Sequence, residues 1–442
     1  MTDATNTKLM TSINGWGYYP KQDAQVITPA SLSECKETLN QNKSLIARGS
    51  GRSYGDSANS HIVLQTTYLD HFIKFDVTSG LLTAESGVTL RDIIKVTVKQ
   101  GWFLPVTPGT SFVTVGGAIA SDVHGKNHHV AGTFGQHVNS ITLMLGTGEI
   151  VSTSPTVLPD LFHATCGGMG LTGVILNATI KLIPINSAYI IQKTIKAGSI
   201  EDACEAFQAN STVPYSVAWI DCLKTGSHMG RSVLITGEHS DKGQLDCTFN
   251  QPITVPIHTP AALLNNLTMR VFNEAYWAKA ANNKIHNISL FPYFYPLDAI
   301  GGWNKLYGKT GFLQYQFVLP KIDGVINMRN ILTQITLSGS GSFLAVLKQF
   351  GSVNKNLLSF PMEGYTLALD FKLSPSVIDL LQRLDFIVAG MGGRVYLTKD
   401  AVMQESTFKS TYPKWQEFEA VRYKYGAIGK FASAQSKRLG LA

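Results

Sequence analysis

The sequence predicts an α+β fold with two parts of different character. Up to about Ile185, short apolar strands alternate with amphipathic helices and with three glycine-rich loops. Beyond that point, longer segments alternate between apolar and polar residues, which is typical of antiparallel strands. The charged, aromatic segment 407–438 predicts helices that close the structure. Hydrophobic residues make up 44% of the 442 residues, which suits a globular protein with a large core.

Helices and strands of the first part follow from caps and periodicity. Residues 31–34 (Ser-Leu-Ser-Glu) read as a capping box, and the helix after it is expected to bury Leu32, Cys35 and Leu39. A second helix is expected to begin at Thr89, where apolar residues repeat with a helical period. Strands are predicted at 44–47, 62–64, 73–75, 139–145, 149–152 and 174–183, and the glycines between 145 and 149 predict a hairpin.

Three alternating segments of the second part carry a polar face. They are residues 312–318, 343–350 and 365–372. Side chains on these faces either look into a site or are solvated, and the pattern leaves both readings open. The candidate site positions on them are Gln314, Gln316, Lys348, Thr366 and Ala368.

In the rest of the second part, helix caps and prolines predict where helices begin and where loops lie. Residues 374–390 have a serine cap, a proline at the first helical position and a closing glycine, which predicts a helix. A strand over 394–398 is expected to end at Lys399. Residues 251–308 are irregular and proline-rich, which predicts mobile loops around a binding mouth.

Two glycine-rich loops predict a large phosphate-bearing cofactor held along its length. They are residues 47–56 (ARGSGRSYGD) and 108–129 (PGTSFVTVGGAIASDVHGKNHH). Their glycines let the backbone approach a ligand, and Thr110 and Thr114 add hydroxyl groups beside backbone amides. The pattern G-x-G-x-x-Y over 49–54 is one letter short of a dinucleotide fingerprint, and the residues after it would break the helix of a Rossmann site. A two-loop flavin cradle fits better.

Two kinds of side chain are candidates for chemistry. His124, His128 and His129 have a spacing compatible with a metal, but no acidic or cysteine partner stands nearby, so no metal site is expected. His124 instead packs near the cofactor, polarises a substrate oxygen, or is a structural histidine. Lys399 is either a surface lysine or a base with a lowered pKa beside the cofactor.

Charge and composition exclude several classes of protein. The net charge is +7 with a pI near 9.0, which indicates a mildly basic enzyme surface or attraction to anionic lipids or phosphorylated substrates. No basic run resembles a nucleic-acid arm, and no apolar segment reaches the ~18 residues of a membrane span. Five scattered cysteines without a C-x-x-C pair argue against disulfides and zinc.

The loops at 47–56 and 108–138, together with GGMGLTGVI at 167–175, resemble the FAD-binding domain of the vanillyl-alcohol oxidase type. Within that group the chain is similar to the decaprenylphosphoryl-β-D-ribose 2-oxidase family, and the similarity extends through 296–320, 346–351, 358–371 and 392–400. The resemblance implies a split FAD-binding domain, over 1–187 and 394–442, with a substrate domain over 188–393 formed by an antiparallel sheet and flanking helices.

The resemblance also implies an activity. The family oxidises the ribose 2-hydroxyl of a polyprenyl-phosphoryl-β-D-ribose to a 2-keto sugar by direct hydride transfer to flavin N5. A partner NADH-dependent keto-reductase then completes the epimerisation to arabinose, an arabinan precursor for the cell wall. The electron acceptor is a quinone rather than oxygen. We expect a cytoplasmic protein that can attach peripherally to the inner face of the membrane and does not bind nucleic acid.

Site residues carry over position by position from the family. Lys399, Tyr54 and His124 are the alternatives for the catalytic base. Substrate-binding positions are Gln314, Gln316, Lys348, Thr366, Ala368 and Phe294. Positions expected to bind FAD are Gly49, Gly51, Arg52, Ser53, Tyr54, Gly55, Asp56, Gly109, Thr110, Thr114, Gly116, Gly117, His124, Gly125, Lys126, Asn127, Gly173, Val174 and Tyr396.

Three departures from related sequences matter. Arg52 stands where related aldonolactone and alditol oxidases carry a histidine that bonds to the flavin, so the FAD is expected to be non-covalent. Ala368 replaces the cysteine that covalent nitro-aromatic inhibitors attack. Phe294 replaces a tyrosine at the substrate mouth. The alternative function is a soluble sugar-alcohol or aldonolactone oxidase that uses oxygen, and the alternative without chemistry is a basic protein that binds anionic membrane surfaces.

Overall fold

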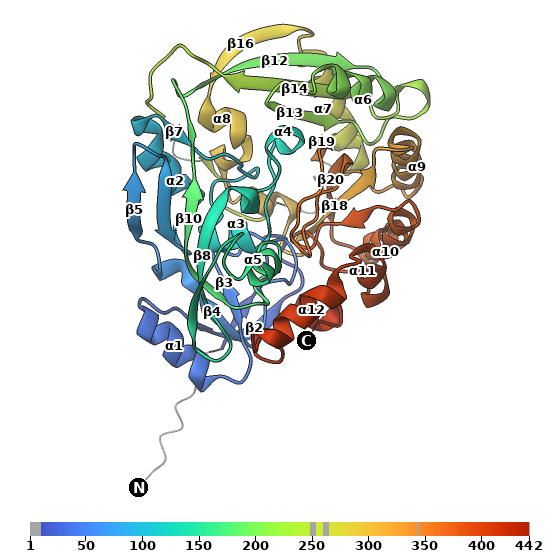
Figure 1. The fold of residues 1–442 in the computed structure, drawn as a ribbon. Helices are drawn as coiled ribbons and strands as arrows, with labels where there is room; N and C mark the ends of the chain where they lie inside the picture. The colour runs from blue at the N-terminus through green and yellow to red at the C-terminus, as the bar shows by residue number, and fades with distance from the viewer. Residues whose placement is uncertain (1–9, 248–252, 260–264, 343, 442) are drawn as a thin grey trace.

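The computed structural model describes residues 10–247, 253–259, 265–342 and 344–441, and its elements form the two predicted parts (Figure 1). The start of the strand predicted at 343 therefore lies outside the described residues. Within these ranges no helix is both long enough and apolar enough to cross a bilayer.

The first part contains two larger sheets, the two-stranded antiparallel sheet of β7 and β11, and the helices between them. One sheet has the order β1-β2-β4-β3, where β2 and β3 both run parallel to β4. The other is antiparallel in the order β5-β6-β10-β8-β9. The strands are β1 Met10–Ile13, β2 Gln22–Ile27, β3 Ile46–Arg48, β4 Ile62–Gln65, β5 Phe72–Asp76, β6 Leu81–Glu85, β7 Trp102–Phe103, β8 Val138–Met144, β9 Ile150–Thr153, β10 Val174–Lys181 and β11 Ile183–Pro184. The helices are α1 Leu32–Gln41, α2 Leu90–Thr97, α3 Val115–Ala120, α4 His128–Ala131 and α5 Pro159–Thr165.

The second part is built on one eight-stranded antiparallel sheet, in the order β16-β12-β14-β13-β19-β20-β18-β21. Helices α6, α9 and α10 pack against it in an outer layer. The strands are β12 Tyr189–Ala197, β13 Tyr215–Ile220, β14 Ser232–His239, β16 Lys284–Ser289, β18 Phe312–Pro320, β19 Ala345–Phe350, β20 Gly364–Lys372 and β21 Arg394–Val395, with the short parallel pair β15 Ile253–Thr254 and β17 Ile300–Gly301 outside the sheet. The helices are α6 Ile200–Ala209, α7 Asn266–Lys279, α8 Leu290–Phe294, α9 Gly324–Leu337 and α10 Pro375–Gly390.

Register places the predicted polar positions together on the sheet. Gln316 lies opposite Ala368 in the β18–β20 pair, and Lys348 lies opposite Thr366 in the β19–β20 pair. Because paired residues share a face, these positions line one side of the sheet. Gln316 is buried, so the solvated reading of this face is wrong.

The chain end returns to the first part. Helices α11 Glu405–Thr411, α12 Trp415–Lys424 and α13 Ala434–Arg438 confirm the predicted closing helices. Arg422, which is fully buried, donates to the Leu171 carbonyl at 3.1 Å, and Phe431 bridges to Leu45. Short 3₁₀ helices complete the fold at Thr66–Tyr68, Val98–Gln100, Phe134–His137, Gly226–His228, Pro296–Ala299 and Trp303–Tyr307.

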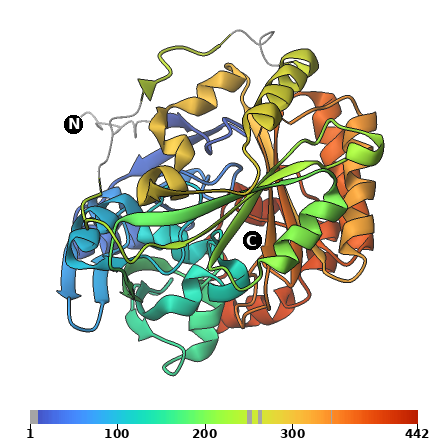
Figure 2. The same ribbon diagram turned by 90° about the horizontal axis from the view of Figure 1, so that it is seen from above.

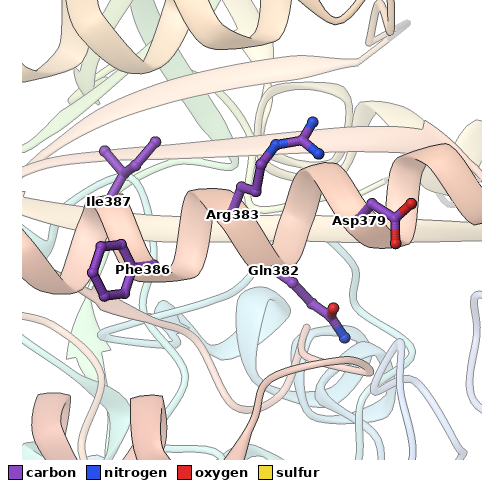
Figure 3. Close-up of a pocket in the computed structure, with 5 residues that line it drawn as sticks. All are labelled: Asp379, Gln382, Arg383, Phe386 and Ile387. Carbon is purple, nitrogen blue, oxygen red and sulfur yellow. The ribbon is translucent and has the colours of Figure 1, made fainter.

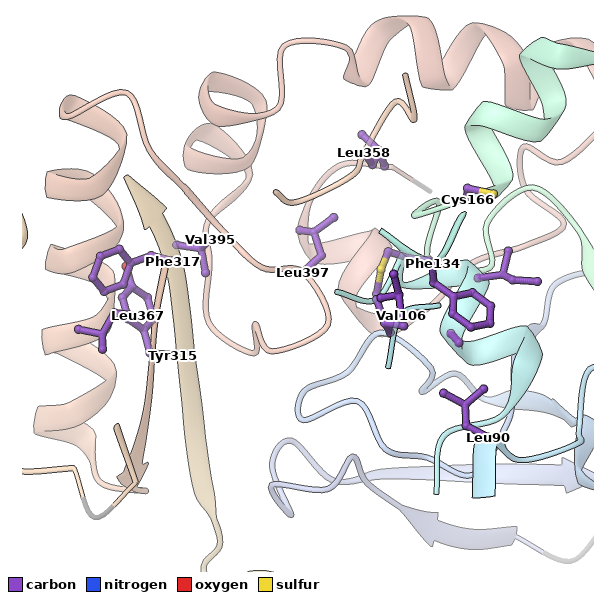
Figure 4. Packing of buried hydrophobic residues seen from close by; sticks show 14 of the residues in the cluster. Leu90, Val106, Phe134, Cys166, Tyr315, Phe317, Leu358, Leu367, Val395 and Leu397 are labelled. Atoms are coloured by element: carbon purple, nitrogen blue, oxygen red, sulfur yellow. The ribbon is translucent and has the colours of Figure 1, made fainter. Parts of the chain in front are cut away.

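One hydrophobic core runs through both parts. Figure 4 shows Leu90 and Phe134 from the first part in the same cluster as Phe317 and Leu367 from the large sheet. The loops between the parts are therefore held from both sides.

Three local predictions are wrong. Residues 251–308 are not only loops, because they contain the 14-residue α7, the strand β16 and the helix α8; residues 251, 252 and 260–264 of this segment lie outside the described residues. The last strand ends at Val395 and not at Thr398, because the Lys399 amide donates to the Tyr396 carbonyl in a turn. Leu32 is exposed, whereas Cys35 and Leu39 are buried as expected.

Candidate active site

A cavity of about 860 Å³ joins the glycine-rich loops to the inner face of the large sheet. Its size lies within the range of small-molecule and cofactor sites. Most of the predicted site positions line it: Gly49, Gly51, Arg52, Ser53, Tyr54, Gly109, Thr110, Thr114, Gly116, Gly117, His124, Gly125, Lys126, Gly173, Phe294, Gln314, Gln316, Lys348, Ala368, Tyr396 and Lys399. A second hollow, on the solvent side of α10 around Phe386, is formed by one helix only (Figure 3).

The two loops interlock at a single glycine. A Cβ atom on Gly49 would overlap Thr114 Oγ1 and would lie 3.2 Å from Thr114 Cβ. Thr114 in turn caps α3, because its hydroxyl accepts from the Gly117 amide at 3.2 Å. The first loop can therefore approach the start of α3 only because residue 49 has no side chain.

The second loop has an open side that faces the cavity. A Cβ atom on Gly109 would meet no protein atom within 4 Å. The Gly116 amide donates to the Ser86 carbonyl at 2.9 Å, which fixes the start of α3 against the first part. The loop is thus held from behind, and its free side can receive a ligand.

The cavity wall fits a flavin dinucleotide on two observations. The buried Nε atom of Arg52 has no hydrogen-bond partner, although its guanidinium lies over the Trp16 and Phe112 rings at 4.2 and 4.9 Å. The glycine-lined space beside Gly109 gives a diphosphate close access to backbone amides. These residues would hold the dinucleotide, and an arginine cannot form the covalent histidyl link.

His124 lies in an aromatic enclosure at the sheet end of the cavity. Its ring centroid is 4.8 Å from that of Phe350 and 5.0 Å from that of Tyr396, and its Nε2 is 2.9 Å from Gln316 Nε2. Burial, with Lys348 as a second cause, holds the pKa of His124 well below its usual value. The imidazole is therefore neutral, and it accepts a hydrogen bond from the Gln316 amide.

Three lysines stand in the same cavity with lowered pKa values. Burial lowers the pKa of Lys348 to about 8. The pKa values of Lys126 and Lys399 fall to about 7 through burial and through the neighbouring Lys348. Lys126 also donates to the Tyr293 carbonyl, and the Lys399 ammonium lies 3.7 Å from the centroid of the Tyr54 ring. The site is thus rich in buried positive charge.

Asp370 is a buried carboxylate beside this region, and it was not among the predicted site residues. It accepts from Gln314 Nε2 at 2.5 Å and from the Tyr307 hydroxyl at 3.4 Å. Burial raises its pKa to about 7, while its negative charge raises the pKa of Lys399. Its position on the polar face of β20, two residues after Ala368, was the sequence signal for it.

A three-way ion pair anchors the turn that carries Lys399. Arg438 donates to Asp400 at 3.0 Å and to Asp56 at 2.7 Å, which connects this turn to the first glycine-rich loop. The Tyr54 amide also donates to the Thr398 carbonyl at 3.0 Å, and a Cβ atom on Gly55 would overlap the Asp400 carbonyl. These contacts set the position of Lys399 relative to the cofactor loop.

Five predicted positions do not line the cavity, and all lie directly behind its wall. They are Gly55, Asp56, Asn127, Val174 and Thr366. Asn127 donates to the Pro105 carbonyl at 2.7 Å, and Thr366 donates to the Phe317 carbonyl at 2.7 Å. Their contacts support neighbouring wall residues, and direct ligand contact for them stays a prediction.

The other two histidines of the second loop have structural partners. His128 Nδ1 accepts from the Gly351 amide at 3.1 Å, and His129 Nε2 is 2.9 Å from the Val213 carbonyl. In the part of the chain that the structure describes, no group of His, Cys, Asp and Glu side chains is placed to hold a metal ion.

The cavity also has an apolar branch that sequence reasoning missed. Trp219 on β13, Val346 on β19 and Phe272 and Tyr276 on α7 line it between the sheet and the helix. Residues from three separate elements meet here, so no local pattern could have located the branch.

Comparison with known proteins gives one match to the cofactor-binding part and further matches to nearly the whole chain. Residues 24–154 match the FAD binding domain family, which covers the two glycine-rich loops. The chain is 37% identical to decaprenylphosphoryl-beta-D-ribose oxidase of Mycolicibacterium smegmatis, over 95% of this chain and 93% of that protein. It is 22% identical to L-gulonolactone oxidase of Bos taurus over 93% of this chain and 94% of that protein. It is 27% identical to D-arabinono-1,4-lactone oxidase of Yarrowia lipolytica over 44% of this chain and 38% of that protein.

FAD is therefore the cofactor of this chain, as the sequence predicts. The similarity to the mycobacterial protein includes both parts of the fold, cofactor loops and sheet alike. The chain belongs to the decaprenylphosphoryl-β-D-ribose oxidase family of FAD-dependent oxidoreductases.

Proposed function

We propose that this chain oxidises the 2-hydroxyl of a polyprenyl-phosphoryl-β-D-ribose to the 2-keto sugar. The observation that carries the proposal is the cavity itself, in which a polar, basic centre adjoins an apolar branch. Such a space suits a sugar phosphate with a lipid attached. A simple polyol would use only the polar centre.

Buried charge favours an anionic substrate. Arg52, Lys126, Lys348 and Lys399 line the cavity, whereas its lining carboxylate is Asp298, already bonded to Ser111 at 2.7 and 2.8 Å. Burying cations without counter-ions is unfavourable, which is why the lysine pKa values are lowered, and a bound anion would supply the missing counter-charge. The flavin diphosphate supplies one, and a substrate phosphate near Lys126 and Lys348 would supply another.

Lys399 is the group we assign to proton removal. With a pKa of about 7, a large fraction of its amine is neutral and able to accept the proton of the sugar hydroxyl. Tyr54 is a poorer choice because burial and the Asp370 charge keep its pKa well above the usual value. His124 is enclosed by aromatic rings and engaged with Gln316, so it is better suited to hold that side chain in place.

Orientation of the sugar falls to the two glutamines of β18. Gln314 is fixed by Asp370, and Gln316 by His124 and by Thr366 at 3.3 Å. FAD, when bound, accepts the two electrons and the hydrogen that leave the sugar carbon. The residues around it orient that carbon and remove the hydroxyl proton. The 2-keto product would then pass to an NADH-dependent keto-reductase.

The test is anaerobic bleaching of the flavin. The purified protein is mixed with a water-soluble, short-chain prenyl-phosphoryl ribose, and in parallel with ribitol and with an aldonolactone. Loss of the visible flavin band with the phosphorylated ribose alone supports the proposal. Bleaching by the uncharged compounds, with peroxide release in air, would instead favour the soluble sugar-alcohol or aldonolactone oxidase.

A further inference from the structure

Helix α7 carries apolar side chains on two opposite sides. Its inner side supplies Phe272 and Tyr276 to the wall of the cavity. Its outer side shows Leu267 and Val271 to solvent, with exposed fractions of 72% and 62%. A helix at the surface of a globular protein normally has one apolar stripe, which faces the core. The outer stripe of α7 is therefore not explained by folding.

The segments beside the cavity mouth repeat this pattern. Ile253 on β15 is 84% exposed and pairs with Ile300 on β17, which itself lines the cavity. Ile257, four residues further along, is 71% exposed. β15 and α7 lie along the same edge of the molecule in Figure 2. Single exposed apolar residues are common on proteins, but here they gather where the cavity opens.

The charges that border these residues are mainly positive. Arg270 and Lys279 on α7 and Lys284 on β16 are exposed. Glu274, the acidic residue of α7, is paired with Lys224 at 2.6 Å and with Arg231 at 3.0 Å. Exposed apolar side chains flanked by lysine and arginine are the composition of helices that lie in the interface of an anionic bilayer.

We propose that α7 and the β15–β17 pair form a docking surface for an anionic lipid bilayer, which we call the mouth surface. It consists of Leu267, Val271, Ile253, Ile257 and Ile300, with Arg270, Lys279 and Lys284 at its border. The inference rests on the proposed function, since a lipid-linked sugar could enter the cavity beside α7 while its tail stays in the membrane. The apolar branch along Phe272 and Tyr276 leads from this surface to the sheet.

The experiment is co-sedimentation of the FAD-loaded protein with vesicles. Vesicles of phosphatidylcholine are compared with vesicles that also contain phosphatidylglycerol, at low and at high salt. We expect binding to the anionic vesicles that weakens at high salt. In the variant Leu267→Glu/Val271→Glu, we expect the apparent affinity for these vesicles to fall by about tenfold or more.

A matched control uses a similar exposed pair at α9, in the outer helical layer of the large sheet. Ile322 and Ile326 beside and within α9 are 82% and 67% exposed, with the same four-residue spacing. The variant Ile322→Glu/Ile326→Glu should bind vesicles like the parent protein. Equal vesicle binding by the parent and the α7 variant, or equal losses in both variants, would overturn the inference.

Activity separates this inference from the function on which it rests. The short-chain, water-soluble substrate should bleach the flavin of the α7 variant as fast as that of the parent protein. If that substrate fails with the parent protein as well, the proposed function fails, and the vesicle result still decides the mouth surface.

Discussion

Contact between Gly49 and Thr114 allows a quantitative test of how the two loops form the flavin cradle. In Gly49→Ala the new methyl group overlaps Thr114 Oγ1, so the loops must separate or the hydroxyl must leave its cap. Overpacking of this kind typically costs about 1–3 kcal/mol. If this cost destabilises the FAD-bound protein and not the apoprotein, the affinity for FAD drops by about 5- to 140-fold.

Removing the hydroxyl should relieve most of that strain. Thr114→Ala alone loses the cap of α3, at about 0.5–2 kcal/mol, which corresponds to about 2- to 30-fold in affinity. In the double variant the nearest remaining approach is 3.2 Å to the Cβ of residue 114, a distance that a shift of a few tenths of an ångström accommodates. We therefore expect the double variant to bind FAD about as well as Thr114→Ala.

Dissociation constants for FAD, measured by fluorescence titration of the apoprotein, complete the double-mutant cycle. Gly390→Ala serves as the control, because a Cβ atom there would meet no atom within 4 Å and the residue lies at the end of α10. Effects that simply multiply in the double variant would show that the two residues do not act through their contact, and the interlocking of the loops would then be wrong.

Five further outcomes are expected. Lys399→Ala should keep its FAD but reduce it about 10²- to 10⁴-fold more slowly in stopped-flow mixing with substrate; near-normal reduction would exclude the lysine as the base. In the parent protein the reduction rate should rise with pH through about 7, because the neutral amine accumulates above the pKa of Lys399. Asp370→Asn should move this rise to lower pH, since the carboxylate raises that pKa, and an unmoved or upward-shifted profile would contradict the pairing. Acid-precipitated protein should give a colourless pellet and a yellow supernatant, because Arg52 cannot bond to the flavin. Nitro-aromatic inhibitors that attack a cysteine should not inactivate the parent protein, whereas Ala368→Cys, which puts a thiol on the cavity wall, should become sensitive to them.

Local sequence patterns were sufficient for much of the fold and of the site. The polar face of β18 was visible because its residues alternate, and the register with β20 then brought Gln316 opposite Ala368. The glycine-rich loops were visible from composition, and both line the cavity. These features depend on neighbours in the sequence, which is why they could be predicted.

Features that depend on distant contacts were missed. Asp370 can be recognised as a site residue only in the folded chain, where it accepts hydrogen bonds from Gln314 and Tyr307. Helix α7 was overlooked because prolines and aromatic residues around it suggested loops, although Asn265 forms a capping box with Thr268 at its start. This capping box is the sequence feature that indicates the helix. The prolines and aromatic residues of the whole segment favoured loops instead.

The ion pairs of Arg438 connect the helix α13 to two parts of the candidate active site. A single guanidinium fixes Asp56, in the first glycine-rich loop, and Asp400, next to Lys399. The position of the first glycine-rich loop relative to Lys399 therefore depends on one side chain of α13. Loss of this side chain in Arg438→Ala should alter turnover while leaving the large sheet intact, because Asp56 and Asp400 both lie outside that sheet.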